Sequence, residues 1–145
     1  MPVIENSVLL RCSPEVAFDY LVDNRNELEW NPVCQSMEKL TDGPVDLGTR
    51  MRAKWKGGPP SEVEIVGYDR PHSWAAHSDG RIEVKFGSRI EPVSEGCMLH
   101  VSFEPIPHGW ARLVFPIIVL MFRRGERAYM GLIKAALEKR EQISE

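Results

Sequence analysis

The sequence predicts an α+β protein in which a curved antiparallel sheet is closed by a long C-terminal helix. Two short helical segments lie between Ser13 and Pro32, strand-like segments follow up to about Pro105, and one long helical pattern ends the chain. Consecutive strands that each keep one solvated face are typical of an antiparallel meander. A bent sheet wrapped around a helix encloses space, so the pattern predicts a protein with an internal cavity.

The first strand is expected at residues 3–10, and the first helix directly after it. Ser13 is a preferred N-cap residue, and Pro14 suits the first helical position, where a missing N–H has no partner to lose. Glu15 places negative charge at the positive end of the helix dipole. The face expected to pack on the sheet carries Ala17, Phe18, Leu21 and Val22.

A second, shorter helix is expected to end at Trp30. Asp23 and Asn24 supply its capping signal. Asn31 precedes Pro32, and the residue before a proline is pushed out of the helical region, so the helix stops there.

The strands of the meander are expected where apolar and charged residues alternate between turn signals. They cover residues 50–56, 62–65, 73–78, 81–90 and 97–104. The turns between them are expected at residues 57–60, 69–71, 78–81 (a tight hairpin) and 94–96.

The last helix follows Pro105 and Pro107. From residue 123 to the end it has a broad apolar stripe of Tyr129, Met130, Leu132, Ile133, Ala136 and Leu137, opposite Arg123, Arg127, Lys134, Glu138 and Glu141. Residues 109–116 lead into it and could form a lid, a dimer patch or a contact with lipid. Alternatively the helix begins there, with Pro116 near its first turn.

Composition excludes several classes of function. The chain has 145 residues, which predicts one domain over residues 1–145. Its net charge is −3 and its longest basic run is Arg123-Arg124, so nucleic acid is not an expected partner. The longest apolar run, residues 113–122, is about half the length that crosses a bilayer, so no stable membrane insertion is expected.

The cellular setting is expected to be cytoplasmic. The N-terminus lacks the charged opening and the apolar region of a signal peptide. Cys12, Cys34 and Cys97 are odd in number and share no metal-ligand spacing, which favours a reduced compartment.

Three motifs near the N-terminus resemble the opening of the polyketide cyclase/dehydrase and START-like (SRPBCC) superfamily: Ser-Pro-Glu-Val-Ala-Phe at 13–18, Leu-Val-Asp at 21–23 and Trp-Asn-Pro at 30–32. Gly48-Thr49-Arg50, Tyr68-Asp69-Arg70-Pro71 and Ile133-Lys134 are further landmarks. The resemblance covers nearly the whole chain. These motifs are structural and contain no catalytic group.

The resemblance implies the helix-grip fold, which is also seen in birch-pollen-allergen-like proteins. It implies a sheet of about seven strands around the last helix, with an apolar cavity between them. Members bind lipids, steroids, polyketides, plant hormones or quinones, and some catalyse cyclisation or dehydration.

The expected ligand-binding lining combines inward strand positions with residues of the helices. It contains Trp30, Met51, Trp55, Val63, Ile65, Trp74, Val84, Phe86, Ser88, Leu99, Val101, Phe103, Phe115, Ile117, Met121, Tyr129 and Ile133. The same residues could simply fill a core. Ser88 could bond a ligand oxygen, or a backbone group or buried water.

An empty cavity would need a reason to exist. At about 24 cal/mol per Å³, an unfilled pocket of about 300 Å³ would cost roughly 7 kcal/mol, which rivals the stability of a whole domain. Such a space persists only if a ligand uses it or water wets its polar groups.

The sequence contains no catalytic motif, and only His77 and Tyr129 are candidates for proton transfer. His77 lies three residues from Trp74, so the two point to opposite faces of a strand unless it bulges. His100 has outward parity, and His72 and His108 lie at turns. No two histidines have metal-ligand spacing, so neither a metal nor a cofactor is expected.

Two main functions fit these observations. The first is binding of a small hydrophobic ligand, such as a lipid, a polyketide or another aromatic or polycyclic molecule, in the cavity. The second, by resemblance, is a polyketide cyclase or dehydratase acting on a ketide held in the same cavity. A protein-interaction module using residues 110–122 remains a third reading, and a homodimer stays open.

Overall fold

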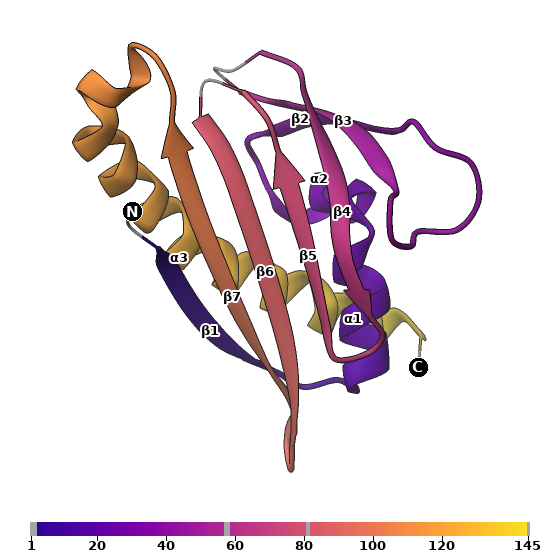
Figure 1. The fold of residues 1–145 in the computed structure, drawn as a ribbon. Coiled ribbons are helices and arrows are strands. Elements are labelled where there is room, and N and C mark those ends of the chain that lie inside the picture. Colours follow the sequence, from indigo (N-terminus) through magenta and orange to yellow (C-terminus); the bar gives the residue numbers. More distant parts are fainter. Residues whose placement is uncertain (1–2, 57–58, 81, 145) are drawn as a thin grey trace.

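The structure is a computed structural model that describes residues 3–56, 59–80 and 82–144. Its elements are β1 (Ile4–Leu10), α1 (Pro14–Val22), the 3-10 turn η1 (Asn24–Asn26), α2 (Glu27–Trp30), β2 (Cys34–Lys39), β3 (Arg50–Trp55), β4 (Ser61–Asp69), β5 (Ser73–Ser78), β6 (Ile82–Val93), β7 (Gly96–Pro107) and α3 (Ala111–Ser144). The strands form one seven-stranded antiparallel sheet in the order β1-β7-β6-β5-β4-β3-β2. The three α-helices lie on one face of this sheet (Figure 1). The helix-grip α+β fold is thereby confirmed.

The capping residues act as the sequence predicts. The Ser13 hydroxyl accepts a hydrogen bond from the Val16 N–H at 3.2 Å, with Pro14 at the start of α1. The Asp23 carboxylate accepts the Arg25 N–H at 3.1 Å and so begins η1. Asn31 has extended backbone angles and ends α2.

Strand β2 was not located in the sequence as a separate element. Its register against β3 shifts between Cys34 and Ser36, and the buried residues Cys34 and Met37 are three apart. A bulge inserts one residue and breaks the alternation that marks a strand. The predicted turn at residues 57–60 and hairpin at 78–81 include positions 57, 58 and 81, which lie outside the described residues.

The packed core lies between the sheet, α1 and the second half of α3. Phe18 of α1 meets the rings of Tyr68 and Trp74 edge to face, each with ring centroids 5.3 Å apart. Met130 and Ile133 of α3 are buried with them, as is Leu137. Leu132, which was expected in the same apolar stripe, is instead exposed, because it lies on the edge of the helix face that turns towards solvent.

The first half of α3 (residues 111–127) and its second half (residues 128–144) are placed differently relative to the sheet. The helix begins at Ala111, and Pro116 falls within it, close to its start. Figure 1 shows these first turns beside the end of β7 and away from the middle of the sheet. Between residues 113 and 122 the apolar side chains are half-buried or exposed, whereas Met130, Ile133 and Leu137 further along the helix are buried.

Candidate ligand-binding site

One end of the inner sheet face carries aromatic side chains that are only half-buried. Phe86 of β6 lies between Ala76 of β5 and Phe103 of β7 in the strand register. Phe86 shares its face with buried Ser88, and Phe103 shares its face with buried Val101. Trp55, at the end of β3, is also half-buried. These rings face the space between sheet and helices without being covered fully.

Aromatic contacts join this end of the sheet to the helices. The Phe103 ring meets Phe122 of α3 with centroids 5.2 Å apart. Trp30 of α2 meets Tyr129 of α3 at 5.7 Å. Both pairs are edge-to-face, a favourable ring geometry. These two contacts join α3 to β7 and α2 to α3.

The structure divides the predicted lining into three groups. The buried residues are Met51, Val63, Ile65, Trp74, Ser88, Leu99, Val101 and Ile133. The half-buried residues are Trp30, Trp55, Val84, Phe86, Phe103, Phe115 and Tyr129. The exposed residues are Ile117 and Met121. Most of the first group belongs to the packed core, so the half-buried group is the part of the lining that a ligand could still cover.

Ile117 and Met121 differ from the expectation that they face inward. Their side chains are 65% and 66% exposed. Nearly every residue from 113 to 122 is apolar, so the sequence there does not indicate which helix face points inward. The structure turns Phe115 and Phe122 towards the protein instead.

Ser88 is a polar residue in otherwise apolar surroundings. It is 6% exposed, and its hydroxyl has no hydrogen-bond partner among the described residues. It lies opposite Trp74 on one neighbouring strand and Val101 on the other. A buried hydroxyl without a partner is costly, so this atom is a point where a ligand or a water molecule would gain a hydrogen bond.

Glu27 is a functional candidate that the sequence analysis missed. Its carboxylate accepts a hydrogen bond from the Trp55 indole N–H and another from the Asn31 amide at 3.3 Å. Burial raises the pKa of Glu27 above its usual value, although these hydrogen bonds oppose the shift. Glu27 lies three residues before Trp30, so the two share a helix face, and this spacing was the available signal.

The thiol of Cys34 lies close to this carboxyl group. Burial, and then the negative charge of Glu27, raise the pKa of Cys34 to about 12. A thiol that stays protonated at neutral pH is a poor nucleophile, so Cys34 serves the packing around Glu27 rather than covalent chemistry.

His77 lies on the outer side of β5, where it alternates with buried Trp74 and Ala76. Its Nε2 is 2.7 Å from one oxygen of Glu83, and the Nε2 of His108 is 3.0 Å from the other. Hydrogen bonds from both imidazoles lower the pKa of Glu83. His77 therefore does not point towards Phe86 and Trp55, whereas Tyr129 does lie on the inner side, against Trp30.

Two carboxylates lie close to His77, and all three side chains are of types that bind metal ions, although the sequence shows no metal-ligand spacing. Ligand atoms of His77, Asp79 and Glu83 all lie within 4.8 Å of one another. They come from β5, the following turn and β6, so local sequence spacing does not reveal the group. Glu83 accepts hydrogen bonds from His77 and His108, and Oδ1 of the exposed Asp79 lies 3.6 Å from the His77 Nε2.

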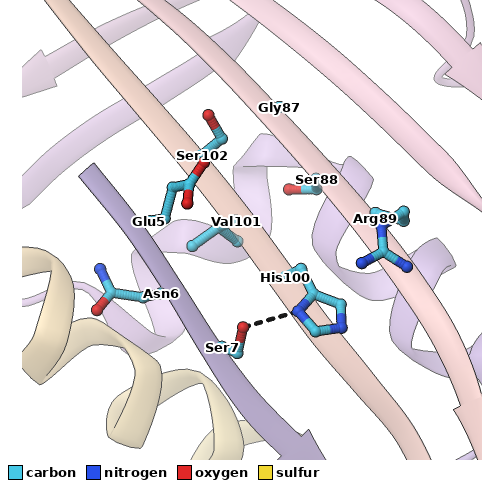
Figure 2. A pocket seen from close by; sticks show the side chains of 9 residues that line it. All are labelled: Glu5, Asn6, Ser7, Gly87, Ser88, Arg89, His100, Val101 and Ser102. Atoms are coloured by element: carbon cyan, nitrogen blue, oxygen red, sulfur yellow. Dashed lines mark hydrogen bonds between the residues drawn. The ribbon is translucent and has the colours of Figure 1, made fainter. Parts of the chain in front are cut away.

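Two hollows occur elsewhere on the described surface. One, of about 350 Å³, lies on the outer face across β1, β7 and β6, where Ser7 and His100 share a hydrogen bond of 2.7 Å (Figure 2). The other, of about 320 Å³, lies in the connection between β2 and β3. Neither lies between the inner sheet face and α3.

The family comparison agrees with the fold. Residues 1–138 match the model of a family described as polyketide cyclase/dehydrase and lipid transport. A search of curated protein sequences found no match. No helix among residues 3–56, 59–80 and 82–144 combines the length and the apolar character needed to cross a membrane.

Solved structures with the same fold differ widely in sequence. Protein TTHA0849 from Thermus thermophilus is 12% identical with a TM-score of 0.78, covering 95% of this chain and 98% of that one. Ara h 8.0201 is 19% identical with a TM-score of 0.63, covering 92% and 98%. The di-domain ARO/CYC protein BexL, from the BE-7585A biosynthetic pathway, is 13% identical with a TM-score of 0.73, covering 94% of this chain and 50% of that one.

Proposed function

Because the chain belongs to the polyketide cyclase/dehydrase and lipid transport family, we propose that it binds a small, mostly apolar molecule between the inner sheet face and the first half of α3. The observation that carries the proposal is the group of half-buried inward rings, Trp55, Phe86 and Phe103. Aromatic surface left partly uncovered inside a fold is available to a ligand.

The half-buried rings favour a flat aromatic, polycyclic or acyl-chain ligand. A ligand that removed about 150 Å² of their apolar surface from water would gain roughly 4 kcal/mol at about 25 cal/mol per Å², before the cost of association. The unpartnered Ser88 hydroxyl and the Glu27 carboxyl supply polar groups that could orient it.

Binding of an environment-sensitive hydrophobic dye tests this proposal. Phe86→Ala and Phe103→Ala should each weaken dye binding by more than they lower the free energy of unfolding. Val66→Ala is the matched control, because Val66 is an exposed apolar residue of β4. Native mass spectrometry of protein purified from its own host should show a retained small molecule. Equal dye binding in all four proteins, with no retained molecule, would exclude the site.

A second candidate function, cyclisation or dehydration of a ketide, is favoured by Glu27. A carboxyl group whose pKa is raised by burial, hydrogen-bonded to an aromatic ring, is a candidate for giving or taking a proton. Glu27→Gln should then abolish turnover of a ketide while dye binding remains. Glu38→Gln, at an exposed position of β2, is the control. Turnover that survives Glu27→Gln would exclude Glu27 as the proton-transfer group.

The cysteines bear on the cellular setting. Cys12, Cys34 and Cys97 are all buried, and none of these three described residues forms a disulfide. Buried thiols outside disulfides suit a reducing compartment, which supports a cytoplasmic location as part of the proposal.

A further inference from the structure

The first half of α3 carries apolar side chains on two opposite faces. The inner face has Phe115, Ile118, Val119 and Phe122, which are half-buried. The outer face has Leu113, Ile117, Leu120 and Met121, which are 85%, 65%, 53% and 66% exposed. Their spacing of four, three and one residues places the outer set on one stripe. A helix that is apolar all round is normally covered on every side, and here the outer stripe is open.

Four arginines lie beside this outer stripe or at its end. Arg124 continues it one turn beyond Leu120 and Met121, with Arg123 and Arg127 beside it and Arg112 near the start of the helix. All four arginines are exposed, and none forms an ion pair with a side chain that the structure describes. Trp110, a residue type enriched at membrane interfaces, is exposed where the helix begins.

The local charge differs in sign from the charge of the whole chain. No aspartate or glutamate occurs between Glu104 and Glu126, although the net charge of the protein is −3. Positive charge is therefore concentrated at the apolar end of α3. A binding partner that complements this surface must combine apolar groups with negative charge.

We propose that the outer stripe of α3, defined here as Trp110, Leu113, Ile117, Leu120, Met121 and Arg124, docks on an anionic lipid surface. The helix lies in the plane of the interface, with its leucine, isoleucine and methionine side chains at the boundary between headgroups and acyl chains. Its arginines stay with the anionic headgroups.

A second copy of the chain complements the outer stripe less well. A two-fold pairing of antiparallel helices about Ile117 would place Arg124 of each copy beside Trp110 of the other. No carboxylate lies in that part of the sequence to pair with the arginine. A desolvated arginine without a partner is costly, whereas a lipid headgroup supplies the missing negative charge.

Vesicle sedimentation of the full chain tests the proposal. The protein should bind vesicles of phosphatidylcholine with phosphatidylserine, bind less to phosphatidylcholine alone, and bind less as salt increases. Arg124→Gln should weaken binding about fivefold, and Ile117→Glu roughly tenfold or more. Val66→Glu, which adds the same charge at an exposed residue of β4, should change binding little.

The variants must remain folded for the comparison to count. Ile117 and Arg124 are exposed, so circular dichroism, melting temperature and dye binding should all match the parent protein. Absence of vesicle binding, or equal binding by Ile117→Glu and the parent, would overturn the proposal. So would a concentration-dependent dimer in analytical ultracentrifugation that Ile117→Glu abolishes. Loss of dye binding alone would instead count against the ligand site and leave the lipid contact standing.

Discussion

At the scale of single residues, Glu27 makes the stability of the protein depend on pH in an unusual direction. Its folded pKa lies above the usual value of 4.5, so the folded chain keeps this proton to a higher pH than the unfolded chain. The contribution of Glu27 to the free energy of unfolding is largest below about pH 4.5, and it falls as the pH rises through the pKa of the folded state. Most paired carboxylates, such as Asp19 beside Arg70 with its lowered pKa, behave in the opposite way.

Glu27→Gln is therefore expected to become more stable relative to the parent protein as pH rises. The difference in free energy of unfolding between variant and parent should grow by about 1.4 kcal/mol for each unit by which the folded pKa of Glu27 exceeds its usual pKa. It should stay constant at pH values above the folded pKa. Urea unfolding between acid and neutral pH measures it, with Glu38→Gln as control. A difference that shrinks with rising pH would mean that the carboxylate is stabilised rather than strained by its surroundings.

Ser88 gives a second prediction at this scale. Since its buried hydroxyl has no partner among the described residues, Ser88→Ala should raise the free energy of unfolding by about 1 kcal/mol. Chemical denaturation measures the change. Destabilisation of similar size would indicate that a water molecule, or a retained ligand, satisfies the hydroxyl.

At the scale of elements, the turn from β6 into β7 depends on Gly96. A Cβ at this position would collide with the carbonyl oxygen of Leu10 and lie 2.9 Å from the backbone nitrogen of Cys12, and its φ of +145° is rarely adopted by other residues. Gly96→Ala should therefore destabilise the protein by several kcal/mol, roughly 3 or more. Gly87→Ala, where nothing lies within 4 Å of the added carbon, is the control and should cost little. Thermal melts of both variants provide the measurement, and equal melting temperatures would contradict the tight approach of β1 to this turn.

Some elements could be predicted from the sequence, and others could not, for physical reasons. Ser13 and Asn31 control their own backbone through local hydrogen bonds and sterics, so α1 and α2 follow from short stretches. Strand parity placed Phe86 and Phe103 on the inner face because alternation has a fixed period of two. Strand β2 was missed because its bulge breaks that period. Glu83 brings His77 and His108 together from distant segments, which local spacing cannot reveal.

The candidate site was less predictable than the fold. On the strands the period of two identified the apolar inward residues, but on α3 the sequence placed Ile117 and Met121 inward although both are exposed. Met51 and Leu99 became fully packed, whereas Trp55 and Phe86 stayed half-buried. Met51 packs among buried residues of β2 to β5, and Leu99 belongs to the cluster that includes Ile133 of α3. The apolar run at 113–122 has no polar face to indicate its orientation.

At the scale of the whole molecule, the two halves of α3 should differ in local stability. The second half buries Met130, Ile133 and Leu137 in the core, whereas the first half is attached mainly through half-buried side chains. Segments with few buried apolar contacts open more readily than the core does. Opening of the first half of α3 would also expose Phe103 and Phe122, which face the candidate site.

Hydrogen exchange followed by mass spectrometry can resolve this difference along one helix. Peptides from residues 112–122 should exchange faster than peptides from residues 129–139, by about tenfold for each 1.4 kcal/mol of difference in opening free energy. An apolar ligand that binds beneath the first half should slow exchange there and leave the second half unchanged, because binding stabilises only the closed state. Uniform protection along α3 would mean that the helix opens as one unit, and the first half could then not admit a ligand independently of the core.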